Sequence, residues 1–100
     1  MNNTMAWKAQ RDKDPNSAGG IAQGGAKSVL INGRKAGIPQ MDVTPHSPCW
    51  VPVPSHCSAK TVSLCKSVII EGKPALRTKI DKDTCGHPRA VGSEDVIIGE

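Results

Sequence analysis

The chain has 100 residues, a formal net charge of +4 at pH 7, 37% apolar residues and two aromatic residues, both tryptophans. This length predicts one domain with a small hydrophobic core. Such a domain usually needs additional stabilisation from a metal, disulfides or a partner surface. The apolar runs are too short for a membrane span, and the scattered cations without interleaved aromatic residues disfavour nucleic-acid binding.

The N-terminal residues 1–13 are polar, and we expect them to form an irregular extension before a domain that spans residues 14–100. They lack the apolar segment of a secretory signal peptide. We therefore expect synthesis in the cytoplasm without general secretory export, with delivery by another route left open.

Short strands separated by tight turns are predicted for the rest of the chain. Glycine pairs on either side of residues 21–23 indicate turns around a short strand. The next strand, 29–31, is followed by Asn32-Gly33, which predicts a type I′ hairpin turn because both central residues of that turn need positive φ. Further strands are predicted at 35–38 and 74–80. No segment has helical apolar spacing, so the chain is predicted to be all-β.

An internal repeat organises the sequence. Residues 28–46 align without gaps with residues 67–85, which places Asp42 on Asp81 and His46 on Cys85. Residues 92–99 begin a truncated third copy, and residues 81–95 align with residues 14–28. Three copies predict approximate three-fold symmetry within one monomer. The duplicated aspartates are expected to cap turns by side-chain hydrogen bonds to the backbone.

The middle copy carries a proline-rich insertion, SPCWVPVPSHC, at residues 47–57. We expect an extended excursion with no regular ladder, because proline restricts the residue before it and donates no backbone hydrogen bond. It would bring four side chains to one end of the molecule: Cys49, Trp50, His56 and Cys57.

All histidines and cysteines lie between residues 46 and 87, almost all in the segments that connect strands. Structural zinc takes four donors in a tetrahedron, commonly mixing Cys thiolate and His nitrogen. Gly86 allows its two neighbours to turn toward one point. One donor from each copy plus the insertion gives the predicted ligand set: His46, His56, Cys85 and His87. Zinc is preferred because the site would be closed, with nitrogen and sulfur ligands and no redox role; the sequence leaves iron open as the alternative.

Two other interpretations of the cysteines stay open. Four cysteines could form a disulfide framework, which the missing signal peptide disfavours. Cys57 would replace His56 as a ligand if His56 pointed away, and Cys49 is an undecided candidate. Cys65 is interpreted as a small buried apolar residue.

An enzyme is not expected. A cysteine near a histidine could be a thiol nucleophile, but no third residue that would orient the pair is evident. Candidate acids and hydroxyls such as Asp42 and Ser28 are duplicated by the repeat, whereas a catalytic pair should be unique.

The chain resembles PAAR-repeat proteins over residues 14–100. The resemblance is carried by the segments VLINGRKA and VIIEGKPALRTKID, each followed by His or Cys, and by the closing segment GSEDVIIG. That family's pattern is a Val-rich strand, Asn-Gly-x-Pro-Ala-Ala-Arg, then Gly-Asp, a Cys or His, and a closing Gly-Ser-Pro-x-Val. The chain departs from it in three ways. Residues 35–38 read KAGI, Met41 and Ile80 stand for the Gly of Gly-Asp, and the first copy has Ala18 in place of a ligand.

The resemblance implies a small conical fold of three repeated hairpin units, with zinc at the apex and a base that docks on a trimeric β-helical spike. Such a monomer would sharpen the spike of a contractile phage tail or a type VI secretion system and help pierce the target cell envelope. It would reside at the tip of the virion tail or be secreted by the contractile machine. The strand residues expected at the base are Val29, Ile31, Val68, Ile70, Val96 and Ile98.

The alternative function is a free-standing zinc-binding adaptor for a peptide or nucleic acid. Its ligand set would consist mainly of cysteines: Cys49, Cys57, Cys65 and Cys85.

Overall fold

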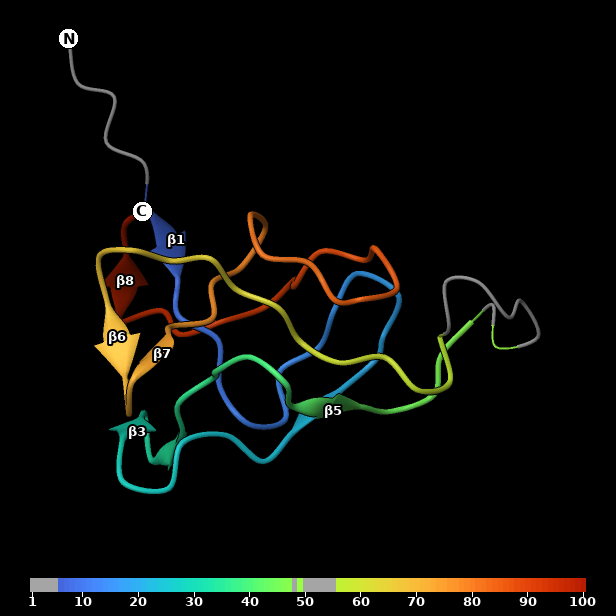
Figure 1. The fold of residues 1–100 in the computed structure, drawn as a ribbon, viewed down its shortest axis with the longest axis horizontal. Helices are drawn as coiled ribbons and strands as arrows, with labels where there is room; N and C mark the ends of the chain where they lie inside the picture. Colours follow the sequence, from blue (N-terminus) through green and yellow to red (C-terminus); the bar gives the residue numbers. More distant parts are fainter. Residues whose placement is uncertain (1–5, 48, 50–55) are drawn as a thin grey trace, which may run out of the picture.

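A computed structural model describes residues 6–47, 49 and 56–100, and within these residues it contains strands and turns but no helix (Figure 1). The prediction of an all-β chain is confirmed. No helix that is long and apolar enough to cross a membrane occurs in this described part. The strands are β1 (Trp7–Lys8), β2 (Ala22–Gln23), β3 (Leu30–Ile31), β4 (Arg34–Lys35), β5 (Asp42–Val43), β6 (Ile69–Ile70), β7 (Lys73–Pro74) and β8 (Ile97–Ile98).

Three equivalent antiparallel pairs gather at one end of the molecule (Figure 1). In the first, β3 and β4 are joined by Asn32-Gly33, whose φ values of 55° and 77° are those of a type I′ turn, as predicted. Glu71-Gly72, with φ values of 53° and 80°, joins β6 to β7. The third pair consists of β1 and β8, from opposite ends of the chain. A fourth pair, β2 with β5, lies outside this group.

The predicted domain boundary at residue 14 is wrong. β1 supplies the strand that the truncated third copy lacks, and Ala9 and Gln10 are completely buried. Strand pairing uses backbone groups that every non-proline residue carries, so the polar composition of this segment conceals its role. The predicted strands at 35–38 and 74–80 are also too long, because β4 and β7 end at Lys35 and Pro74.

Beyond these strand pairs, backbone hydrogen bonds join each copy of the repeat to the other two copies. The Gln10 N–H donates to the Leu76 carbonyl (2.9 Å), the Leu76 N–H to the Gly37 carbonyl (3.0 Å), and the Gly37 N–H to the Gln10 carbonyl (2.7 Å). These bonds close a ring in which each copy donates once and accepts once. A Cβ atom at Gly37 would lie 2.7 Å from the Gln10 carbonyl oxygen, so the ring requires glycine there. Approximate three-fold symmetry is therefore built into the backbone.

Backbone bonds also correct the alignment of the repeats. Lys13, Gln40 and Lys79 all have positive φ, and each N–H donates to the corresponding carbonyl of its own copy. In each copy, the residue whose carbonyl accepts this bond donates its own N–H to a second carbonyl, which is that of Asp14, Met41 or Asp81. Ile80 is thus an extra residue, and Met41 rather than Asp42 matches Asp81.

The expected capping role therefore belongs to a different pair of aspartates. The Asp81 carboxylate accepts the N–H of Arg77 (2.7 Å), and the Asp14 carboxylate accepts the N–H of Arg11 (2.9 Å). Asp42 is exposed and forms an ion pair with Lys60. The ungapped alignment of Asp42 with Asp81 is wrong because one inserted residue shifts the register by one position.

The core is thin and consists of small and branched apolar residues. Ala9, Ala36 and Ala75 are fully buried at equivalent positions beside the central ring. Cys65 is a free, buried cysteine in the same cluster, which confirms its interpretation as a small apolar residue. Val43, Ala59 and Cys85 form a second small cluster.

Candidate metal centre

His46 follows β5 and is held by the ladder between copies. Two residues earlier, the Thr44 N–H donates to the Ile21 carbonyl (2.9 Å). The His46 Nδ1 atom lies 2.8 Å from the carbonyl oxygen of Thr44. Because a carbonyl only accepts, Nδ1 carries the proton, and the Nε2 lone pair is free to bind a metal. A backbone carbonyl that fixes the tautomer in this way is typical of metal-binding histidines.

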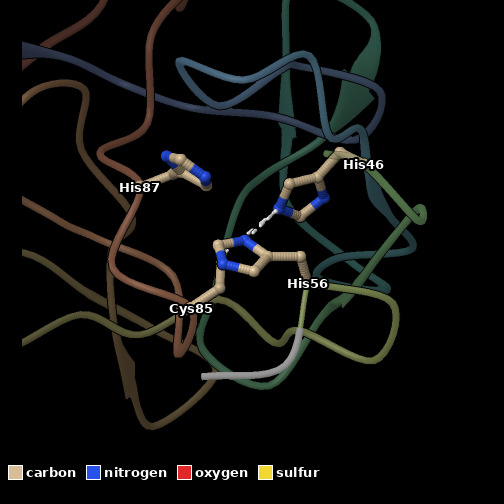
Figure 2. A group of neighbouring side chains, drawn as sticks. All are labelled: His46, His56, Cys85 and His87. Atoms are coloured by element: carbon tan, nitrogen blue, oxygen red, sulfur yellow. Dashed lines mark hydrogen bonds between the residues drawn. The ribbon is translucent and has the colours of Figure 1, made fainter. Parts of the chain in front are cut away.

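Cys85 and His87 lie on one tight turn. The Gly86 N–H donates to the Asp83 carbonyl (2.8 Å), and the Asp83 N–H donates to the His87 carbonyl (2.9 Å). Gly86 has a φ of 95°, in the left-handed region that favours glycine. The turn directs both flanking side chains toward His46 (Figure 2).

His56 comes from the C-terminal end of the insertion. Its carbonyl accepts the His46 N–H (3.3 Å), and its Nδ1 atom lies 3.4 Å from the His46 Nε2 atom. Burial lowers the pKa of His56, and the neighbouring imidazoles of His87 and His46 lower it further. The neutral form, which is the form that binds a metal, is therefore favoured.

The structure brings all four predicted ligands together. One donor atom from each of His46, His56, Cys85 and His87 lies within 4.8 Å of the others (Figure 2). The His46 Nε2 atom is 3.3 Å from the Cys85 Sγ atom. Donor atoms about 3.3–3.7 Å apart are expected around a tetrahedral ion with zinc-like bond lengths.

The chemistry of the donors also fits a metal. The Nε2 atom of His87 is buried and has no hydrogen-bond partner among the described residues, and such an atom is costly unless something binds it. The Cys85 thiol is buried and free. Three nitrogens and one sulfur form a set that could hold a metal ion.

The remaining cysteines lie elsewhere. Cys49 and Cys57 form a disulfide, so neither replaces His56, which points into the cluster. Cys65 lies in the main core, where its Sγ atom is 3.5 Å from the Gly99 carbonyl oxygen. The all-cysteine ligand set is therefore not assembled, and the four-cysteine framework reduces to one disulfide. Trp50 and the predicted extended course of residues 50–55 lie outside the described residues.

A buried polar network that the sequence analysis missed supports the centre. The Arg89 side chain is fully buried and donates to the Gln10 side chain (2.8 Å), the Asp14 carbonyl (2.5 Å) and the Asp83 carboxylate (2.5 Å). Asp83 also accepts a bond from the Asn16 amide (2.8 Å). The network links the N-terminal segment to the turn that carries Cys85 and His87. No sequence pattern separates Arg89 from the scattered surface cations.

The strand residues predicted for the base divide into two groups. Three are buried in the core: Ile31, Ile70 and Ile98. The other three are partly exposed: Val29 and Val68, which pack against the core, and Val96, which is 36% exposed. The strand residue directly before each buried isoleucine is more exposed. The exposed fractions are 62% for Leu30, 58% for Ile69 and 54% for Ile97. Because strand side chains alternate between faces, the apolar side chains that point outward are mainly those of Leu30, Ile69 and Ile97.

The fold and the cluster define a small all-β domain with three-fold repetition and a candidate metal centre. No protein-family model and no curated protein matches the chain.

Proposed function

We propose that this protein is a metal-pinned tip that caps a trimeric β-helical spike of a contractile injection machine and helps pierce the target cell envelope. The observation that carries the proposal is the three-fold base. Three equivalent strands at one end each present an exposed apolar side chain, from Leu30, Ile69 and Ile97. The PAAR-like phrases of the sequence occur in the same segments.

Symmetry makes such a base suited to a trimer. A trimeric spike presents three equal chain ends with unpaired strand edges, which need to be covered. A monomer that repeats one surface three times can bind all three chains at once through strand pairing and apolar contact.

The base is also braced internally. Each hairpin tip, or the matching position after β8, bonds to the start of the strand in the next unit. The Ser28 N–H donates to the Glu71 carboxylate (2.6 Å), the Asn32 amide to the Asp95 carboxylate (2.7 Å), and the Ser67 N–H to the Glu100 backbone oxygen (2.8 Å). A surface braced in this way loses little conformational entropy on docking.

Zinc is the proposed metal. The nitrogen and sulfur donors are largely buried, and a fully protein-ligated tetrahedral site is the form that structural zinc takes. The ion would stabilise the end opposite the base, where the apolar cluster is small. The proposed role is mechanical, with no catalytic step. We propose that the protein is made in the cytoplasm and then carried on the machine, on a phage tail or by a type VI system.

Binding to the spike trimer encoded by the same genome tests the proposal. Size-exclusion chromatography with light scattering is expected to give one chain per trimer. The triple variant L30D/I69D/I97D should lose binding while keeping its metal content and secondary structure. The variant L64D/V91D alters two exposed apolar residues outside the strands and should bind normally. Failure to bind, or three chains per trimer, would contradict the proposal.

A further inference from the structure

His56 differs from the other three candidate ligands in how it is held. His46 lies two residues after a backbone bond between copies, and Cys85 and His87 lie on a turn closed by two backbone bonds. His56 belongs to the insertion, outside the repeated ladder. Within the described part of the chain, its hydrogen-bond contacts are the backbone bond and the ring contact to His46. Its ring also lies beside the His87 ring, with the centroids 4.9 Å apart, but among the described residues no backbone bond to another copy of the repeat fixes its position.

A covalent link lies directly beside this weakly anchored ligand. Cys57, the next residue, forms a disulfide with Cys49, eight residues earlier, and their Cα atoms are 5.1 Å apart. Cys57 is exposed and Cys49 is half-buried, whereas His56 is buried. A reductant can therefore reach the disulfide without opening the metal cluster.

We propose that the Cys49–Cys57 disulfide is a redox-sensitive clamp that positions His56, so that the oxidised protein retains its metal and the reduced protein releases it faster. The inference rests on the proposed metal centre, but not on docking to a spike. In this arrangement Cys49 and Cys57 are positioning residues, and His56 is the ligand through which they act.

Loop entropy is the physical reason. A disulfide that closes a short loop removes conformations that the open segment would otherwise sample. With the loop closed, His56 stays close to the other three donors and rebinds the ion whenever one bond opens. With the loop open, the His56 arm can move away, and the remaining three ligands hold the ion less tightly. Loss of an element that orients a ligand typically costs about 10–100-fold in metal affinity.

Metal release is the measurement that tests the clamp. The zinc-loaded protein is mixed with a chromogenic chelator, with and without a phosphine reductant. The phosphine transfers two electrons to the disulfide and takes oxygen from water to become the phosphine oxide, which leaves two thiols. A phosphine is chosen over a dithiol because a dithiol would itself bind zinc. Mass spectrometry confirms the gain of two hydrogens.

Release is expected to be roughly tenfold faster in the reduced protein. The C49S/C57S variant should release metal at the fast rate under both conditions, which separates the disulfide from other effects of the reductant. The H56Q variant should also be insensitive to reductant, because the clamp acts through His56. In cobalt-substituted protein, reduction should change the visible absorption, which reports the ligand field directly.

Equal release rates from oxidised and reduced wild type would overturn the clamp while leaving the metal centre intact. Slower release after reduction would also overturn it, because a freed thiol would then be acting as a ligand. A protein that binds no metal would overturn the centre and the clamp together. Loss of spike binding with normal metal release would contradict only the proposed function.

Discussion

The Nη1 atom of Arg89 lies 2.5 Å from the Oδ2 atom of Asp83, and both side chains are completely inaccessible to solvent. The two residues flank the turn that carries Cys85 and His87, so the candidate metal centre is built next to a buried ion pair. Removing one partner of such a pair leaves an uncompensated charge in the interior, which is much costlier than losing an exposed pair.

We therefore expect Arg89→Met to lower the free energy of unfolding by about 3–5 kcal/mol. Chemical denaturation of the metal-free protein measures this without interference from metal binding. The double variant R89M/D83N is the control, because it removes the charge that R89M leaves unpaired and should recover part of the loss. A decrease below about 1 kcal/mol, the scale of a surface pair, would show that the buried pair contributes little.

Removing the metal should lower the melting temperature sharply. An ion present at about a thousand times its dissociation constant stabilises the folded state by about 4 kcal/mol. In a domain of this size that corresponds to roughly 15 °C or more. Calorimetry before and after treatment with a chelator gives the value. Identical melting curves would mean that no structural metal is bound.

The two free cysteines should behave differently when they are substituted. Cys85→Ala removes the sulfur donor and is expected to abolish stoichiometric metal binding. Cys65→Ala should retain one metal ion per chain, because Cys65 lies in the main core and not in the cluster. Elemental analysis of the purified variants distinguishes the two cases. Equal metal content in both variants would contradict the assignment of Cys85.

The contact between Glu71 and Ser28 predicts a specific dependence on pH. Hydrogen bonds from the Ser28 hydroxyl and from the Ser28 and Lys27 N–H groups lower the pKa of Glu71 from its ordinary value of 4.5. The folded state therefore favours the carboxylate. This contribution to stability is fully present above pH 4.5 and is lost as the pH falls through the lowered pKa.

We expect Glu71→Gln to be less stable than the wild type at neutral pH and to approach wild-type stability in acid. Unfolding curves of the two proteins from neutral pH down to about pH 3, taken without metal, provide the difference. Using the difference cancels the titration of the histidines, which both proteins share. A difference that stays constant with pH would show that the Glu71 carboxylate is not stabilised by these bonds.

Much of the candidate site could be predicted from the sequence. The donor atoms of His46, His56, Cys85 and His87 suit a closed metal site. His46, Cys85 and His87 lie at or just after the ends of repeated units, and His56 lies in the insertion. Donor chemistry belongs to each residue by itself, and a repeat places its copies around one axis. Those two properties were sufficient to select four side chains that the fold brings within 4.8 Å.

The alignment of the copies could not be fixed in the same way. One extra residue, Ile80, moves Asp81 onto Met41, and the similarity of the neighbouring letters conceals the shift. The disulfide between Cys49 and Cys57 was likewise undetermined, since pairing depends on which cysteines approach within about 4.4–6.8 Å between Cα atoms. Whether the Arg89 side chain is buried or exposed depends on whether the fold places a buried acceptor within hydrogen-bonding distance of it.

By itself, then, the sequence determined the all-β class, the Asn32-Gly33 turn, the repetition and the metal-binding residue types, because these follow from local backbone preference and side-chain chemistry. Only the tertiary structure decided that Trp7–Lys8 completes the third antiparallel pair, that Gln10, Gly37 and Leu76 close a central ring, and that Asp83 and Arg89 support the turn that carries Cys85 and His87. Backbone donors and acceptors are the same in nearly every residue. Their partners are therefore chosen by the folded arrangement of the whole chain.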